Sequence, residues 1–137
     1  MSEGQRGNLS SVKLLNDLSA TEVAELEQLC SWRHYSSQEQ IIDRQSDTTD
    51  IFFISDGRVR IVNYSLSGRE ITFDELAEGD HFGELAAIDS QPRSASVMSL
   101  NNCLVASLSQ ERFKALLKSH PNMAISFMED LAGMVRS

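Results

Sequence analysis

The chain has 137 residues and a formal net charge of −8 at pH 7, with 41% hydrophobic and 23% charged residues. This length and composition predict one globular domain with a buried core, and the acidic balance argues against direct binding of this segment to nucleic acid or an anionic membrane. No apolar run approaches the ~20 residues that a membrane-spanning helix needs.

The N-terminal residues are polar and contain no apolar stretch of the signal-peptide type. We expect residues 1–13 to form a flexible tail on a cytoplasmic protein, and residues 14–137 to form the domain. Cys30 and Cys103 lie far apart in the sequence and outside any Cys-x-x-Cys motif, so we expect both to be reduced thiols.

The domain is predicted to begin with helical structure. Leucines within 14–18 favour a short helical turn that docks on the core. Ser19 followed by Glu22 is the pattern of a capping box, and apolar residues then recur at helical spacing. A helix is therefore predicted over residues 20–30.

From Trp32 to Leu108 the pattern changes to short β-branched and aromatic runs separated by turn residues. The runs lie at 41–42, 51–54, 59–62, 71–73, 96–98 and 103–106. Asp56-Gly57 predicts a tight hairpin, and Ser67-Gly68 predicts another turn. Many short strands at even spacing predict a mainly β fold with flanking helices, in which the strands form an antiparallel β-roll or jelly-roll barrel.

Helical patterning returns at the end of the chain. Ser109 is placed to cap a helix, and Pro121 suits the first position of another. The last helix carries an apolar stripe at Ile125, Met128, Leu131 and Val135. This stripe could cover a pocket or pair with a second copy of the chain. Its first turn is expected to pack on the barrel, and its later turns are expected to form a dimer contact or to continue into a longer helix.

The segment from Phe82 to Val97 combines a carboxylate and a guanidinium with small residues. Gly83 permits a close backbone approach, and the residues that follow Glu84 can form a short helix whose first N–H groups attract an anion. Arg93 suits a phosphate, and Glu84 can accept from a hydroxyl group. Two interpretations remain open: the two charges pair with each other, or they bind one ligand that carries both groups.

The stretch Phe82-Gly83-Glu84-Leu85-Ala86 through Pro92-Arg93-Ser94-Ala95 resembles the phosphate-binding cassette of cyclic nucleotide-binding domains. Ile54-Ser55-Asp56-Gly57-Arg58-Val59 resembles a strand-turn-strand signature of that family, and Gly79-Asp80 lies upstream of the cassette as expected. The chain departs from the family pattern at Ser37–Ile41 and at Ser46-Asp47, where glycines are usual. Both departures fall in barrel turns, away from the cassette.

The resemblance implies a role for each cassette residue. Glu84 would accept from the ribose 2′-hydroxyl, and Arg93 would neutralise the cyclic phosphate. The remaining contacts to the ligand would come from Gly83, Leu85, Ala86, Ser94 and Ala95, and the base would be walled by Val62, Ile71 and Phe73. Family members with Thr after the arginine favour cyclic GMP, so Ser94 favours cyclic AMP.

The resemblance further implies a regulatory domain, without enzymatic activity or a cofactor, whose last helix transmits ligand occupancy. A homodimer through that helix is expected. The 137 residues contain no effector, so the output requires a partner or a further domain that the sequence does not identify. The alternative is a degenerate, ligand-free domain used for protein interaction or dimerisation. A jelly-roll metalloenzyme is disfavoured, because its metal centre would need His34, His81 and His120 to converge.

Overall fold

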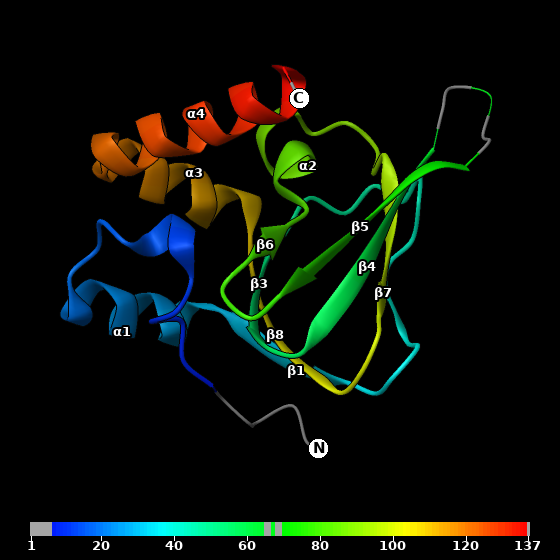
Figure 1. The fold of residues 1–137 in the computed structure, drawn as a ribbon. Coiled ribbons are helices and arrows are strands. Elements are labelled where there is room, and N and C mark those ends of the chain that lie inside the picture. The colour runs from blue at the N-terminus through cyan, green and yellow to red at the C-terminus, as the bar shows by residue number, and fades with distance from the viewer. Residues whose placement is uncertain (1–6, 65–66, 68–69, 137) are drawn as a thin grey trace.

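The computed structural model describes residues 7–64, 67 and 70–136, without the side chains of residues 64 and 70–73. The N-terminal part is helical, with a 3-10 turn, η1 (Lys13–Leu15), followed by α1 (Ala20–Leu29) (Figure 1). The predicted capping box is confirmed. The Glu22 N–H donates to the Ser19 hydroxyl at 3.1 Å, and the Ser19 N–H donates to the Glu22 carboxylate at 2.8 Å. These bonds fix the start of α1.

The predicted tail at 1–13 needs correction. The side chains of Leu9 and Val12 are only 0% and 1% exposed and belong to the hydrophobic core. The N–H of Leu9 donates to the Glu27 carboxylate at 2.8 Å. Residues from Leu9 onward are therefore part of the domain, because their apolar side chains dock on the core. The first six residues of the expected tail lie outside the described residues.

Within the described residues, the strands form two antiparallel sheets of four strands each, which confirms the predicted fold class. One sheet has the order β1-β8-β3-β6, and the other has the order β2-β7-β4-β5 (Figure 1). The bounds are β1 (Ser31–Tyr35), β2 (Gln40–Ile42), β3 (Ile51–Asp56), β4 (Arg58–Tyr64), β5 (Glu70–Ala77), β6 (His81–Phe82), β7 (Ala95–Ser99) and β8 (Cys103–Leu108).

The hairpin predicted at Asp56-Gly57 is wrong. In this structure β3 pairs with β6 and β8, whereas β4 pairs with β5 and β7. The turn therefore carries the chain from one sheet to the other. Gly57 has φ +101°, and a Cβ there would lie 2.7 Å from the carbonyl oxygen of Asn102. A glycine is therefore needed at this position because the backbone of Asn102 comes so close, and not because the turn is a hairpin. The predicted turn at Ser67-Gly68 lies partly outside the described residues.

Two helices follow the last strand. These are α3 (Gln110–Ser119) and α4 (Pro121–Arg136), and α4 lies alongside α3 (Figure 1). The Ser109 hydroxyl accepts from the Arg112 N–H at 3.3 Å, which confirms the predicted cap. Phe113 of α3 and Phe127 of α4 meet edge to face, with their ring centroids 5.4 Å apart.

The core has two parts. One lies between the helices and the β1-β8-β3-β6 sheet and includes Phe53, Phe113 and Met123, each 0% exposed. The other lies between the two sheets and includes Ile54, Val59 and Phe82. Burying these side chains is the main favourable contribution to folding, at about 25 cal/mol per Å² of apolar surface removed from water.

Candidate functional site

A cavity of about 750 Å³ opens where the β2-β7-β4-β5 sheet, the cassette and α4 meet. The structure brings together at this cavity all seven residues that the sequence singled out for ligand contact: Gly83, Glu84, Leu85, Ala86, Arg93, Ser94 and Ala95. The predicted short helix is present as α2 (Glu84–Asp89). Its first residue, Glu84, therefore stands at the cavity together with Arg93, which lies nine positions further along the chain.

Gly83 has the backbone conformation and the open space that the close approach requires. Its φ is +82°, in the left-handed region that glycine adopts without strain. A Cβ at this position would lie 2.9 Å from Nη1 of Arg93 and 3.1 Å from the carbonyl oxygen of Asp50. Any side chain here would push against the guanidinium.

The guanidinium of Arg93 is held in place by oxygen atoms of three segments. Its Nη1 donates to the Gly83 carbonyl at 2.9 Å, its Nη2 to the Asp50 carbonyl at 2.8 Å, and its Nε to the Thr48 hydroxyl at 3.2 Å. Arginine carries five N–H groups. Three of them are used by these bonds, so two remain available to an anion at the cavity. The residues at 48 and 50 were missed from the sequence, because carbonyl and hydroxyl acceptors leave no motif.

Arg93 is a buried cation, only 4% exposed. Its guanidinium carbon lies 5.7 Å from the centroid of the Phe52 ring, which stacks on Phe82 at 5.0 Å. Removal from water lowers the pKa of Arg93, while the carboxylates of Asp50 and Glu84 act in the opposite direction. The group stays charged at neutral pH, since free arginine has a pKa above 12. An anion in the cavity would supply a charge partner for this buried cation.

The backbone N–H and carbonyl of Arg93 are both held by one neighbouring turn. The N–H of Gln45 donates to the Arg93 carbonyl at 2.8 Å, and the Arg93 N–H donates to the Ser46 carbonyl at 2.9 Å. Gln45 has φ +71°. This turn thus holds Arg93 without the usual glycine of the family.

The helix α2 is held at its C-terminal end by α3. The Gln110 side-chain amide donates to the carbonyls of Ala86 and Ala87 at 3.3 and 3.1 Å, and to the Ser90 hydroxyl at 2.7 Å. These acceptors lie in the last turn of a six-residue helix, where the chain itself offers few donors.

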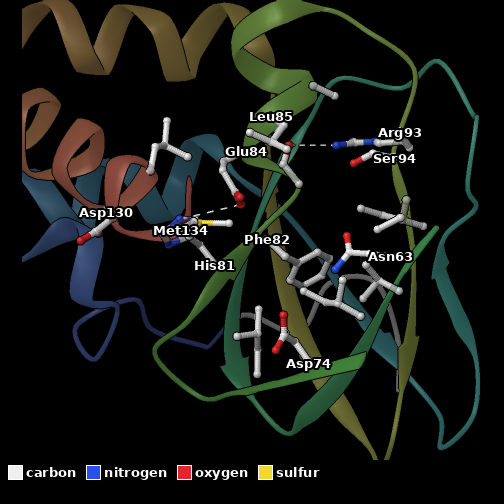
Figure 2. A pocket seen from close by; sticks show the side chains of 18 of the residues that line it. Asn63, Asp74, His81, Phe82, Glu84, Leu85, Arg93, Ser94, Asp130 and Met134 are labelled. Atoms are coloured by element: carbon white, nitrogen blue, oxygen red, sulfur yellow. Dashed lines mark hydrogen bonds and ion pairs between the residues drawn. The ribbon is translucent and has the colours of Figure 1, made fainter. Parts of the chain in front are cut away.

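Glu84 forms no ion pair with the guanidinium of Arg93. Among the described residues, the charged-group neighbour of the buried Glu84 carboxylate is His81, at 3.9 Å from Nε2 to Oε1, a contact that is an ion pair when the imidazole is protonated (Figure 2). His81 also faces Phe127 of α4, with ring centroids 6.1 Å apart. The interpretation in which Glu84 and Arg93 pair with each other is therefore wrong, because each has other partners.

Of the three residues expected to line the base, the structure describes the side chain of Val62 alone. Of the described side chains of β4, Ile61 and Asn63 line the cavity, and Val62 does not. Side chains alternate between the two faces of a strand, so Val62 points away. The side chains of Ile71 and Phe73 lie outside the description. The buried Val59 shares a face with Ile61 and Asn63, and this period of two was the signal in the sequence.

The last helix contributes to the cavity from the opposite side. Phe127, Leu131 and Met134 of α4 line it, whereas Ile125, Met128 and Val135 are 52%, 57% and 85% exposed. The predicted stripe therefore splits in two: only Leu131 of its four residues turns to the cavity. Met123 and Phe127, which the stripe omitted, are the residues that anchor α4 in the core.

No metal centre was found among the described residues: none of their His, Cys, Asp and Glu side chains form a group of three or more that could hold an ion. In the same part of the chain, no helix has the length and apolar character needed to cross a membrane.

Comparison with known proteins gives a consistent result. Residues 32–120 match the family model of the cyclic nucleotide-binding domain. The cAMP-dependent protein kinase regulatory subunit of Debaryomyces hansenii is 31% identical over 109 residues, which are 80% of this chain and 23% of the relative. The cAMP-activated global transcriptional regulator CRP of Salmonella typhimurium is 27% identical over 104 residues, 75% of this chain and 50% of the relative.

Among solved structures, the catabolite activator protein of Thermus thermophilus is similar with a TM-score of 0.79 and 27% identity, over 90% of this chain and 58% of that one. This chain thus spans about half or less of the length of the curated relatives it matches. The matched residues include both sheets and the whole cassette. The chain belongs to the cyclic nucleotide-binding domain family.

Proposed function

We propose that this domain binds cyclic AMP, in preference to cyclic GMP, and that α4 transmits the occupancy of the pocket to a partner. The observation that carries the proposal is the arrangement of Arg93 and Glu84. One buried cation with two N–H groups to spare and one buried carboxylate face the same cavity. A cyclic nucleotide supplies the anion and the hydroxyl group that these two side chains require.

The phosphate is assigned to the side of the cavity formed by Arg93, Ser94 and the first turn of α2. The two remaining N–H groups of Arg93, one on each terminal nitrogen, are donors for phosphate oxygens. Ser94 adds a hydroxyl donor, and Figure 2 shows it beside Arg93. The first N–H groups of α2 have no acceptor within the helix, so they are further donors for the same anion.

The ribose is assigned to Glu84, whose carboxylate accepts from the 2′-hydroxyl. Preference for cyclic AMP is supported by Ser94, which stands where family members that favour cyclic GMP carry threonine. The names of the matched kinase subunit and transcription regulator refer to cyclic AMP as well. The ligand is bound and released unchanged in this proposal, because its phosphate faces a cation and hydroxyl donors and no group assigned here acts as a nucleophile.

Signal transmission is assigned to α4. Phe127, Leu131 and Met134 face the cavity, so a bound base adds apolar contacts to this helix. A ligand that contacts one position of α4 better than another shifts the population toward that position. The coupling free energy between a ligand site and the element that responds to it is typically about 1–3 kcal/mol.

A second function, dimerisation with or without ligand, is favoured by the outer face of α4. Ile125, Met128 and Val135 are all exposed there. In this candidate a second copy of the chain covers these side chains. Concentration-dependent mass measurement, with and without cyclic AMP, tests it.

Isothermal titration with cyclic AMP, cyclic GMP and 5′-AMP tests the main proposal. We expect cyclic AMP to bind with a Kd of about 1 μM or tighter, cyclic GMP more weakly, and the open phosphate of 5′-AMP more weakly still. Absence of heat and of thermal stabilisation at millimolar cyclic AMP would refute it.

A further inference from the structure

Five carboxylates besides Glu84 line the cavity, and two of them have a visible partner. Asp80 accepts from Lys13 Nζ at 3.0 Å and from the Ala77 N–H at 2.9 Å. Asp89 accepts from the Gln91 N–H at 3.0 Å. The other three are Asp74 of β5 and Glu129 and Asp130 of α4, and with the described residues none of these forms a hydrogen bond or an ion pair. Asp74 is the one of the three that lies on the sheet, and it is exposed. An acceptor group is thus available on the floor of the pocket.

The position of Asp74 in the sheet is set by the register of β4 and β5. Asp74 lies opposite Ile61, and Leu76 follows on the same face two residues later. Ile61 and Leu76 also line the cavity. The carboxylate of Asp74 thus has the apolar Ile61 as its cross-strand neighbour and the apolar Leu76 as its neighbour along the same face of β5. A flat heterocycle fits such a site when its faces contact the apolar groups and its edge reaches the carboxylate.

Asp74 lies far from the phosphate side. The order of the sheet is β7-β4-β5, and Arg93 leads into β7 while Asp74 belongs to β5. Two strand spacings separate them, about 10 Å in all. Figure 2 shows the same separation, with Arg93 and Ser94 at one end and Asp74 below Phe82 at the other. A cyclic nucleotide anchored by its phosphate at Arg93 can reach Asp74 when its base extends along the sheet.

An ionised carboxylate only accepts hydrogen bonds. Adenine presents an amino group at C6, whereas guanine presents an oxygen acceptor there and carries its own donors further along the edge, at N1 and at C2. A carboxylate therefore favours adenine over guanine when it faces the C6 position. Resting on the proposed function, we infer that Asp74 accepts a hydrogen bond from the C6 amino group of the base and so selects adenine over guanine. Asp74 is a specificity-determining residue in this assignment, and Arg93 and Glu84 supply the affinity that all cyclic nucleotides share.

The test compares three ligands with the same ribose phosphate: cyclic AMP, cyclic GMP and the cyclic monophosphate of unsubstituted purine riboside. The last carries hydrogen at C6, so it removes the donor without adding an acceptor. With the unmodified chain, we expect cyclic AMP to bind about tenfold more tightly than the purine analogue, since a hydrogen bond to a charged group is lost. Cyclic GMP should bind more weakly than cyclic AMP by at least the same factor.

The variant Asp74→Ala should reduce the preference for cyclic AMP over the purine analogue to less than about threefold, and cyclic GMP should gain relative to cyclic AMP. Asp74→Asn serves as a second variant, because its amide can donate to the guanine oxygen and should raise the relative affinity for cyclic GMP further. Asp89→Ala is the matched control, since it removes another carboxylate that lines the cavity and should leave the ratios unchanged.

The possible outcomes distinguish the role of Asp74 from the binding of cyclic nucleotides by the domain. If cyclic AMP and the purine analogue bind the unmodified chain equally, or if Asp74→Ala keeps the full preference, the role of Asp74 is refuted while cyclic nucleotide binding stands. If none of the three ligands binds, both are refuted.

Discussion

Gly83 and Arg93 determine each other's geometry. The Gly83 carbonyl accepts a hydrogen bond from Nη1 of Arg93 at 2.9 Å. A Cβ added to Gly83 would also lie 2.9 Å from that nitrogen, which is too close for a carbon atom. The residue that positions the guanidinium is thus also the residue whose substitution would displace it.

The first prediction concerns Gly83→Ala. We expect a loss of about 1–3 kcal/mol in the free energy of unfolding, because alanine is strained at φ +82° and its Cβ meets Arg93. Affinity for cyclic AMP should fall at least tenfold as the guanidinium moves. Denaturant unfolding and titration measure the two effects.

Gly133→Ala is the matched control for stability. An added Cβ at Gly133 has nothing within 4 Å, and the residue lies inside α4. Alanine there should stabilise the domain by about 0.5–1 kcal/mol. If Gly83→Ala behaved like Gly133→Ala, the close approach to Arg93 would not constrain position 83.

The second prediction concerns Arg93→Ala. The substitution leaves the carbonyls of Gly83 and Asp50 without their donor in a buried site, so we expect the free energy of unfolding to fall by about 2–4 kcal/mol. Binding of cyclic AMP should weaken about 100-fold or more, because the phosphate loses its charge partner. Unfolding curves and isothermal titration measure these values.

Two variants separate folding from binding at this site. Arg93→Lys keeps the charge but loses the planar fork, so it should bind weakly even when folded. Arg33→Ala removes an arginine whose side chain is 60% exposed and pairs with Glu39 at 3.3 Å, and it should cost less than about 1 kcal/mol. Normal affinity in Arg93→Ala would mean that the phosphate lies elsewhere.

The third prediction separates the charge of Glu84 from its hydrogen bond. Glu84→Gln should weaken binding of cyclic AMP about tenfold, because the amide oxygen still accepts from the ribose hydroxyl, whereas Glu84→Ala should weaken it about 100-fold. Glu78→Gln is the control, since Glu78 is an exposed glutamate in the turn before β6. Equal affinities in the two Glu84 variants would argue against an acceptor role.

The fourth prediction concerns pH and the pair His120–Glu22, which joins the start of α4 to α1. Nε2 of His120 lies 2.9 Å from the Glu22 carboxylate, and Nδ1 lies 3.2 Å from the Leu116 carbonyl. Both partners accept, so the doubly protonated ring satisfies both. The hydrogen bond to Glu22 raises the pKa of His120 above its ordinary 6.5, and the bond to His120 lowers the pKa of Glu22 below its ordinary 4.5.

The contribution of His120 is fully present below pH 6.5 and is lost as the pH rises through the raised pKa. The contribution of Glu22 is present above pH 4.5 and is lost as the pH falls through the lowered pKa. The pair therefore stabilises most between these two values. Glu22→Gln keeps the capping acceptor but removes the charge, so its Tm should lie further below that of the unmodified chain at pH 5.5 than at pH 8.5. Equal Tm differences at both pH values would contradict this.

The sequence predicted the parts of the fold that local chemistry determines. The capping box at Ser19, the cap at Ser109 and the short helix after Glu84 are all present, because each depends on residues within one turn. The hairpin at Asp56-Gly57 failed for the opposite reason. Its strands choose partners far along the chain, and the same glycine fits a crossing between sheets.

The site was predictable to the same extent. The cassette residues lie close together in the sequence and carry distinctive chemistry, so the sequence alone singled them out, and the structure places them at one cavity. The acceptors that hold Arg93 come from residues 48, 50 and 83, and only the fold brings them together. The inner face of α4 was assigned to the wrong stripe, because a 16-residue helix with apolar residues on more than one face offers several choices. The contact between Phe113 and Phe127 determines which face of α4 turns toward the core.

The side chain of Gln110 links the C-terminal end of α2 to the start of α3. It holds two carbonyls and one hydroxyl at the end of α2, and Gln110 is itself the first residue of α3. A displacement of α2 must either break these bonds, at about 1 kcal/mol each, or move the start of α3 with it. Only His120 separates α3 from α4, so in the proposed mechanism a displacement of α2 that carries the start of α3 with it would also move the start of α4.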